Sequence, residues 1–360
     1  MQANFCSPNN ENNKYSCFNN NSLIKIAESF NNHYPHKKIE IPKKLNSNNR
    51  EFFWNNLKDS MNKETYCKDE VCWLDKRVVK NIQDDSIEES FRPEKPYSWY
   101  QNKNTWLSTT DINNVLSQYE TNSDLKYIGA VPIDFDQELS PGICVVNELC
   151  KLNLERLYLS GYRKLAIVFN LDPHDQPGSH WVSMFVDMNN GGIYYFDSYG
   201  KEPPLEVAVL MERIRVLGNE LINKNIISNL DIEHQIVSKI KKKGGKYIAE
   251  SSEFIEDTPT YLTNYTNNKD GKIKLIKEII ENDTILINNK QNYKYVIQRG
   301  FRKFYNNIRF QYEGSECGVY SIHFITELIK GKKFIDVIHN IVDDKTINKK
   351  RNYFYRPIVQ

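Results

Sequence analysis

The chain has 360 residues, and its 48 lysines and arginines nearly balance its 46 aspartates and glutamates, which leaves a net charge of only +2. This balance argues against nucleic-acid binding as the main role, because that role depends on an excess of positive charge. No window approaches the roughly 20 apolar residues that span a bilayer, and the start of the chain lacks a secretory signal pattern. We therefore expect a protein that needs no nucleic acid and does not insert into membranes.

Seven cysteines are scattered along the chain, and no two of them have the CxxC spacing of a zinc site or a redox pair. This pattern indicates neither a disulfide framework nor a metal site. We expect reduced thiols, as in a cytosol-like compartment, and no metal or other cofactor.

The first part of the chain, residues 1 to about 95, is polar and rich in asparagine, with short helical stretches such as 23–31. It ends in the proline-bearing segment RPEKPYSWY, which is typical of a boundary. The sequence therefore predicts a mainly helical arm domain over residues 1–95 and a second domain over residues 96–360.

The second domain is predicted to begin with a helix. Its sequence STTDINNVLSQYE offers Ser108 or Thr109 as the N-cap and places apolar residues at helical spacing. A further helix is predicted over 142–159, because its apolar residues share one face and a glycine stands where the helix would stop.

Three strands are predicted next, with the sequences LAIVFN (165–170), HWVSMFVDM (180–188) and IYYFDS (193–198). The last two are joined through Asn-Asn-Gly-Gly, which is a strong hairpin signal. Another helix is predicted to start at the proline pair that follows, Pro203-Pro204.

The last third of the chain is less regular. Residues 222–298 are rich in lysine and asparagine, with isolated apolar clusters such as IKLIKEII, and we interpret them as an inserted, partly exposed segment. The sequence IRFQ (308–311) is predicted as a strand leading into a turn. From Cys317 onward, CGVYSIHFITELIK has one continuous apolar face, which predicts a helix buried in the core. Helices mixed with an antiparallel hairpin favour an α+β domain.

Cys317 is the first candidate for chemistry, because it stands where a Gly-Ser-Glu turn meets the buried helix. Free backbone N–H groups and the positive end of the helix dipole favour a thiolate at such a position. A buried structural cysteine is the more common explanation for a cysteine considered alone. The nucleophile hypothesis therefore depends on partners.

The proposed partners lie on the predicted hairpin. His180 begins one strand after Pro-Gly-Ser, so its ring can emerge at the sheet edge and take the thiol proton. Asp197 ends the returning strand about as far from the turn, so antiparallel pairing should bring it beside His180, as a base and its orienting carboxylate require. Considered separately, a structural histidine and a turn-capping aspartate are equally ordinary. His174, in an aspartate-flanked loop, is a rival base, whereas His323 points away from Cys317 on the same helix.

Gln311 lies six residues before Cys317, at the end of the predicted IRFQ strand. Its side-chain amide could help the backbone N–H of Cys317 to bind the oxyanion of a tetrahedral intermediate. A surface glutamine is the ordinary alternative when this residue is considered without its neighbours.

Together these motifs resemble the clan of adenovirus-type and SUMO proteases, whereas papain-like enzymes carry the cysteine first. The elements occur in this order: His180-Trp181, Asp197-Ser198, Gln311 and Cys317-Gly318. Trp106-Leu107 looks like the pair that opens the catalytic domain in SUMO proteases. The resemblance covers roughly residues 100–335, and it implies an α+β cysteine protease core with a central mixed sheet flanked by helices.

Within this clan the chain is most similar to the polyprotein-processing proteases of African swine fever virus and of related large DNA viruses. The similarity lies in HWVSMFVDMNNGGIYYFDSYGKEPP and in the cysteine-bearing start of the chain. The swine fever virus enzyme carries asparagine where this chain has Asp197, so the third residue follows the SUMO-protease pattern instead. The segment between Asp197 and Gln311 is also longer than the clan usually carries.

This resemblance implies a cysteine endopeptidase that cleaves viral polyproteins after Gly-Gly during virion maturation, in the virion and in viral factories of the host cytoplasm. The expected partner is a polypeptide with a Gly-Gly-Xaa site, held in a narrow slot with Trp181 and Trp106 as candidate walls, although both tryptophans are also typical of a core. One alternative is a deSUMOylating or deubiquitinating isopeptidase that acts on host conjugates of ubiquitin-like proteins. A second alternative is an acetyltransferase built on the same triad. A third is an inactive binding protein, but the intact set of four residues argues against it.

Overall fold

The computed structural model describes residues 5–10, 15–121, 123–228, 230 and 300–358, and the backbone of six short strands between 240 and 298. The chain divides into two compact units. The arm unit consists of Met1–Thr105, Ser117–Asn122 and Lys349–Gln360, and the core unit consists of Trp106–Leu116 and Ser123–Asn348. We describe each unit by itself.

The arm unit is helical, which confirms the predicted stretch at 23–31 as part of α1. Its helices are η1 (Pro8–Asn10), α1 (Asn20–His33), α2 (Arg50–Thr65), α3 (Glu70–Trp73), α4 (Arg77–Lys80), α5 (Asp85–Glu88), α6 (Ser98–Gln101) and α15 (Arg351–Phe354). Helix α1 begins after Asn19, whose side chain accepts a hydrogen bond of 2.9 Å from the N–H of Ser22. Its buried face, which includes Leu23 and Phe30, packs in a hydrophobic cluster of the arm unit.

The prediction of reduced thiols is wrong for six of the seven cysteines. They form the disulfides Cys6–Cys17, Cys67–Cys72 and Cys144–Cys150, which leaves Cys317 as the free cysteine. The paired residues are separated by 11, 5 and 6 positions, none of which is a CxxC spacing. The spacing of the cysteines did not predict these disulfides, because the fold decides which cysteines come close enough to bond.

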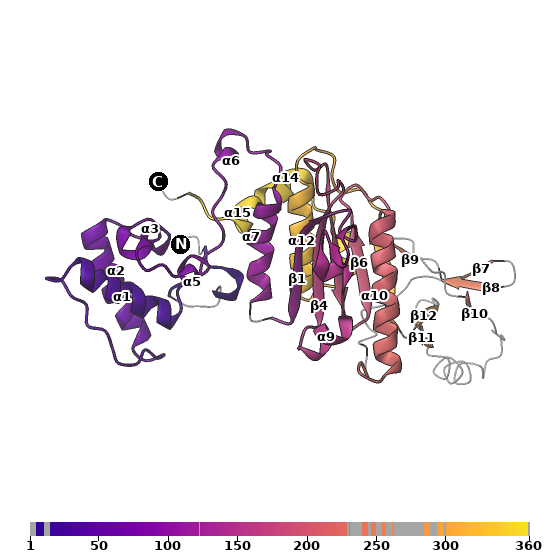
Figure 1. Cartoon of the computed structure of the whole chain (residues 1–360), viewed down its shortest axis with the longest axis horizontal. Coiled ribbons are helices and arrows are strands. Elements are labelled where there is room, and N and C mark those ends of the chain that lie inside the picture. The colour runs from indigo at the N-terminus through magenta and orange to yellow at the C-terminus, as the bar shows by residue number, and fades with distance from the viewer. Residues whose placement is uncertain are drawn as a thin grey trace. The chain divides into compact units, whose positions relative to one another are not determined.

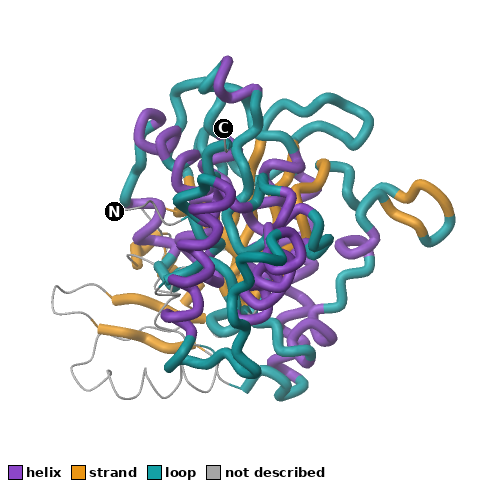
Figure 2. The backbone as a smooth tube through the Cα atoms, turned by 90° about the vertical axis from the view of Figure 1, so that its left-hand side faces the viewer, coloured by secondary structure: helices purple, strands orange, loops and turns teal. Residues whose placement is uncertain are grey.

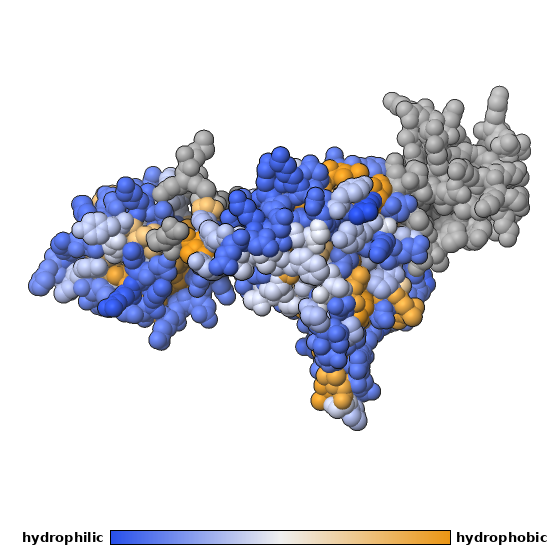
Figure 3. Space-filling model, turned by 90° about the horizontal axis from the view of Figure 1, so that it is seen from above, coloured by the Kyte–Doolittle hydropathy of each residue, from blue (hydrophilic) through white to orange (hydrophobic). Residues whose placement is uncertain are grey.

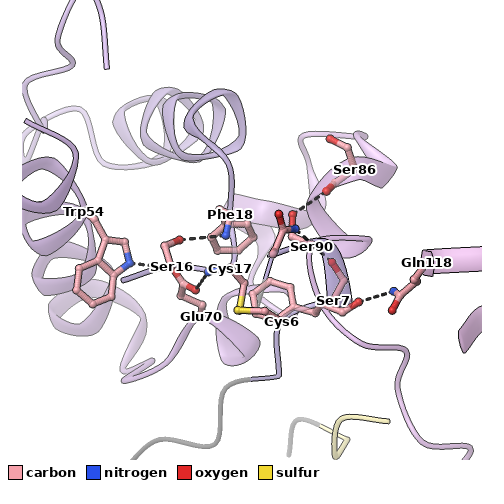
Figure 4. The surroundings of a disulfide bond; sticks show 12 residues. Cys6, Ser7, Ser16, Cys17, Phe18, Trp54, Glu70, Ser86, Ser90 and Gln118 are labelled. Carbon is pink, nitrogen blue, oxygen red and sulfur yellow. Dashed lines mark hydrogen bonds between the residues drawn. A yellow bond between two sulfur atoms is a disulfide. The ribbon is translucent and has the colours of Figure 1, made fainter. Parts of the chain in front are cut away.

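Figure 4 shows how the surroundings of Cys6–Cys17 link distant parts of the arm unit. The backbone N–H of Cys17 donates to Glu70 Oε2 at 2.9 Å, and Trp54 Nε1 donates to Glu70 Oε1 at 2.7 Å. This carboxylate therefore joins the disulfide segment to helices α2 and α3.

The core unit contains a mixed six-stranded sheet in the order β1-β4-β5-β6-β13-β9. Its strands are β1 (Leu125–Pro132), β4 (Lys164–Asn170), β5 (Trp181–Asp187), β6 (Gly192–Phe196), β13 (Arg302–Asn306) and β9 (Phe254–Glu256). All three predicted strands and the hairpin are confirmed as β4, β5 and β6. Because β1 is parallel to β4 and β13 is parallel to β6, the carboxyl ends of these four strands share one edge with the start of antiparallel β5.

Helices cover both faces of this sheet (Figure 1). They are α7 (Thr109–Glu120), α8 (Asn147–Cys150), α9 (Leu154–Leu159), α10 (Leu205–Asn223), α12 (Cys317–Ile329), α13 (Phe334–His339) and α14 (Asp344–Lys349). Alternate residues of β5, including Met184, share a core with α10, while Phe196 of β6 stacks on Phe324 of α12 at 4.8 Å from the other face. The predicted helices at α7, α10 and α12 are confirmed, and the α+β class with them.

The predicted single helix over 142–159 is wrong. In its place a hairpin of β2 (Glu138–Ser140) and β3 (Ile143–Cys144) is followed by α8 and α9. Gly142 makes the hairpin turn with φ 74°, and Asn153 accepts from the N–H of Arg156 at 2.8 Å to start α9. These local caps and turns break a helical periodicity that the apolar residues alone indicated.

The β2–β3 hairpin projects from the rest of the core unit, as the orange strands with a teal turn show in Figure 2. Leu139 and Ile143 are 55% and 51% exposed, and the projection in Figure 3 carries hydrophobic atoms at its end. The Cys144–Cys150 disulfide fastens the base of this hairpin to α8.

The predicted insertion at 222–298 contributes to the main sheet. Strand β9 pairs with β13 and so forms one edge of it. Two smaller sheets consist of β7 (Ile240–Lys243), β8 (Lys246–Ala249) and β10 (Tyr261–Leu262), and of β11 (Thr284–Asn288) and β12 (Lys294–Gln298). The cluster IKLIKEII lies outside the described residues. Among those that are described, no helix combines the length and the apolar character needed to cross a membrane.

Candidate active site

The candidate residues gather at the sheet edge where parallel strands end. His180 directly precedes β5, Asp197 directly follows β6, and Cys317 is the first residue of α12. Since β5 runs antiparallel to β6, the start of one strand and the end of the other lie at the same edge. The sequence places three reactive side chains at element ends, and the topology brings these ends together.

His180 is held between the other two residues. Its Nε2 lies 2.7 Å from Asp197 Oδ1, and the Cys317 side chain is near enough to the ring to raise its pKa. With Nε2 engaged by the aspartate, Nδ1 is the nitrogen left to exchange a proton with sulfur. The side chains of His180 and Asp197 are only 11% and 1% exposed, and Cys317 is 2% exposed. This is the arrangement that the sequence analysis predicted for a nucleophile, a base and an orienting acid.

The pKa of His180 reflects this position. Burial by itself would lower the pKa, but hydrogen bonds and charge interactions with Asp197 and Cys317 outweigh burial and raise it from 6.5 to about 9. The site therefore favours the imidazolium form, which is the form that stabilises a neighbouring thiolate.

The contact between His180 and Asp197 does not arise from directly opposed positions. The ladder pairs Ser183 with Phe196, and its extension would set Tyr199 opposite His180. Tyr199 indeed stacks on the imidazole, with ring centroids 4.6 Å apart and an interplanar angle of 23°. Its backbone N–H also donates to Asp197 Oδ1 at 2.8 Å. The sequence analysis missed this tyrosine, although the hairpin register could have indicated it.

Gln311 lies beside these residues, but it does not end a strand as predicted. Strand β13 stops at Asn306, and the backbone N–H groups of Phe310 and Gln311 instead donate to the carbonyl of Ser198 at 2.8 and 2.9 Å. The Gln311 side chain is fully buried, where Oε1 accepts from Ser198 Oγ and Nε2 donates to the carbonyl of Glu313, both at 2.7 Å. A primary amide has a second N–H bond, and its use in binding an oxyanion stays a prediction.

Known viral proteases resemble the chain in sequence and in fold. No protein-family model matches the chain. A protein of Acanthamoeba polyphaga mimivirus that is named as a thiol protease is 29% identical over 98% of this chain and 93% of its own length. A cysteine protease of African swine fever virus is 46% identical over 50 residues, which are 13% of this chain and 18% of that protein. A crystal structure of an African swine fever virus protease matches the fold with a TM-score of 0.50 and 16% identity, over 98% of this chain and 96% of that one.

The chain is a cysteine-type peptidase. Its fold is that of the African swine fever virus protease. Its relatives named above are proteins of large DNA viruses, as the sequence motifs indicated.

The two tryptophans predicted as slot walls differ in exposure. Trp181 is 5% exposed and donates from Nε1 to the carbonyl of Leu107 at 2.9 Å, whereas Trp106 is 47% exposed. A Cβ on Gly318 would lie 3.0 Å from Leu107 Cδ1 and 3.3 Å from Trp181 Cδ1. Trp181 and Leu107 therefore pack against the first turn of α12, and the absence of a side chain at Gly318 lets them approach. For both tryptophans, the role as a wall of a substrate slot stays a prediction.

The rival histidines have other partners. His174 is 39% exposed, and its Nδ1 lies 2.6 Å from Asp134 Oδ2. His323 lies 3.8 Å from Glu327 on the same helix. These contacts leave His180 as the histidine that the structure places against the cysteine.

A buried carboxylate that the sequence analysis missed directly precedes the nucleophile candidate. Glu316 is 2% exposed, and its Oε1 accepts from Ser315 Oγ at 2.6 Å and from Asn348 Nδ2 at 2.8 Å. These bonds hold the N-cap residue of α12, which directly precedes Cys317. Across the described residues, no group of three or more His, Cys, Asp or Glu side chains is arranged to hold a metal ion.

Proposed function

We propose that this peptidase is an endopeptidase that cleaves viral polyproteins after Gly-Gly during virion maturation. Cys317 is the nucleophile, His180 is the general base and acid, and Asp197 orients the imidazole. Gln311 and the backbone N–H of Cys317 bind the oxyanion. We place the enzyme in the virion and in viral factories of the host cytoplasm, where its substrates would be assembled.

The reaction proceeds in two halves. The Cys317 sulfur attacks the carbonyl carbon before the cut, and His180, having taken the thiol proton, gives it to the leaving amine as the C–N bond breaks. A thioester then links the acyl part of the substrate to Cys317. His180 next takes a proton from water, the hydroxide attacks the thioester, and the thiol is restored when sulfur leaves.

The observation that carries this proposal is the position of one imidazole between a buried carboxylate at 2.7 Å and the free cysteine. A structural histidine needs no free thiol beside it, and a structural cysteine needs no buried ion pair. The names of the viral relatives support proteolysis as the use of this arrangement.

Crowding around the proposed nucleophile supports a preference for glycines before the cut. Cys317 is almost fully covered, and Trp181 and Leu107 pack on the next residue. Glycines would suit such a crowded approach to the sulfur because they carry no side chain. We place Trp106, which is exposed, at the outer wall of the substrate slot and Trp181 deeper within it.

The test uses the purified chain with two sets of substrates. One set consists of peptides with Gly-Gly-Xaa and matched peptides with Ala-Ala-Xaa, and the other consists of ubiquitin and SUMO conjugates. We expect cleavage after Gly-Gly only, and we expect a thiol-reactive Gly-Gly probe to label Cys317, as mapped by mass spectrometry. Turnover of conjugates alone would favour the isopeptidase alternative, and acetyl transfer from coenzyme A without cleavage would favour the acetyltransferase.

A further inference from the structure

We propose that Asn306 is a positioning residue of this peptidase, which holds the backbone of Asp197 so that its carboxylate stays directed at His180. The proposal rests on the functions proposed above for His180 and Asp197. It concerns a residue that touches neither the nucleophile nor the base.

The contacts between the two residues run in both directions. Asn306 Oδ1 accepts from the N–H of Asp197 at 2.9 Å, and Asn306 Nδ2 donates to the carbonyl of Asp197 at 2.7 Å. The same Nδ2 donates to the carbonyl of Ile308 at 3.0 Å. One side chain therefore satisfies both backbone polar groups of the proposed orienting acid and joins them to the chain that leads toward Gln311.

The topology explains why this asparagine can reach Asp197. Asn306 is the last residue of β13, Asp197 follows the last residue of β6, and the two strands are parallel neighbours. Carboxyl ends of adjacent parallel strands meet at one edge, so residues 109 positions apart in sequence become direct neighbours. Close packing continues beyond them, because a Cβ on Gly200 would lie only 2.7 Å from the carbonyl carbon of Ile308.

Burial makes this arrangement specific. Asn306 is fully buried and Asp197 is 1% exposed, so water cannot readily replace the amide. Removal of the amide would leave one N–H and two carbonyl groups without their partner, and buried polar groups resist this. The backbone of Asp197 would then shift toward other partners, and the 2.7 Å contact with His180 would lengthen.

The test measures the pKa of His180 by NMR in a Cys317→Ala background, with His180→Gln used to assign the ring signal among the seven histidines. The background removes the cysteine, so the remaining increase in pKa comes from Asp197. We expect Asn306→Ala to lower the pKa of His180 by at least about one unit, since a displaced carboxylate stabilises the imidazolium less.

The matched control is Asn219→Ala. Asn219 also uses its side chain to hold the backbone at β13, accepting from the N–H of Phe301 at 2.8 Å, but at the opposite end of the strand. We expect it to lower stability while the pKa of His180 is unchanged. If the two substitutions acted only by disturbing β13, they would change the pKa of His180 by the same amount. Equal changes in this pKa would therefore overturn the proposal.

Two further measurements keep the outcome clear. In the chain that retains Cys317, Asn306→Ala should lower kcat for a Gly-Gly peptide about tenfold or more with little change in KM, as loss of orientation implies. If Asn306→Ala fails to fold, Asn306→Ser, which retains an acceptor for the N–H of Asp197, should show a smaller decrease in the pKa. An unchanged pKa in a folded Asn306 variant refutes the positioning role, whereas a wild-type chain that cleaves no peptide refutes the proposed function and leaves the NMR test valid.

Discussion

The arm unit and the core unit differ in how they use cysteine. The arm unit joins its four cysteines into two disulfides, which close short loops in a unit whose described elements are helices. The core unit has a large sheet and one disulfide, Cys144–Cys150, but it keeps Cys317 as a free thiol at the start of a buried helix. Cysteine thus serves only as a cross-link in the arm unit, whereas the core unit also uses it as the proposed nucleophile.

The arm disulfides and the free thiol of the core unit have opposite redox requirements. Reductant would keep Cys317 in the thiol form that attacks a carbonyl, but it would also open Cys6–Cys17 and Cys67–Cys72. A short peptide engages the site alone, so its cleavage should depend on the core unit and tolerate loss of the arm disulfides. The predictions below test this separation, from the largest expected effect to the smallest.

The largest effect is expected at the nucleophile and the base. Cys317→Ala and His180→Ala should each lower kcat for a Gly-Gly peptide by at least about 10⁴-fold, because either change removes the chemistry itself. Thermal unfolding should show that both variants remain folded. His174→Ala is the matched control, since it removes an aspartate-bonded histidine that lies elsewhere, and it should retain wild-type turnover. Comparable losses in this variant would contradict the assignment of His180.

Asp197→Ala should have the next largest effect on activity. Because His180 can still take the proton but is no longer oriented, a low residual activity should remain, with kcat reduced about 10³- to 10⁴-fold. The same peptide assay measures it, with longer incubation. Asp197→Asn should retain more activity than Asp197→Ala, since an amide can still orient the ring. Activity as low as that of Cys317→Ala would argue that the aspartate does more than orient.

The arm disulfides should affect stability and not peptide cleavage. Opening Cys6–Cys17 by serine substitution should cost about 3 kcal/mol of unfolding free energy, and opening Cys67–Cys72 about 2 kcal/mol, because the first closes the longer loop. Urea unfolding without reductant, followed by fluorescence of tryptophans in the arm unit, measures both. In reductant the wild type and both variants should converge. Loss of kcat for a short peptide in these variants would show that the two units are not separable.

The smallest effect is a pH dependence of stability that belongs to the core unit. The pKa of His180 is raised in the folded chain from 6.5 to about 9, so its contribution is complete below pH 6.5 and is lost as the pH rises through about 9. The free energy of unfolding should therefore fall across this window. In His180→Gln the free energy of unfolding should fall less steeply with pH. An equally steep fall in that variant would show that other groups cause it.

Local pattern was sufficient for most elements of the core. Strands β4 to β6, helix α10 and the buried helix from Cys317 are confirmed, because each has a strong period and clear end signals. The helix expected over 142–159 failed, since Gly142 and Asn153 impose a turn and a cap that override the apolar spacing. The strand expected at 308–311 also failed, because Asn306 ends β13 and the chain turns to contact Ser198.

The sequence by itself determined which residues are candidates for the chemistry: a cysteine at a helix start, a histidine and an aspartate at strand ends, and a glutamine before the cysteine. These positions follow from local periodicity and from the order of the motifs. Only the tertiary structure decided the disulfide pairs, the stacking of Tyr199 on His180 and the hold of Asn306 on Asp197. Such contacts join strand ends and loops that are distant in sequence, and they depend on the sheet order and on burial, which no local pattern encodes.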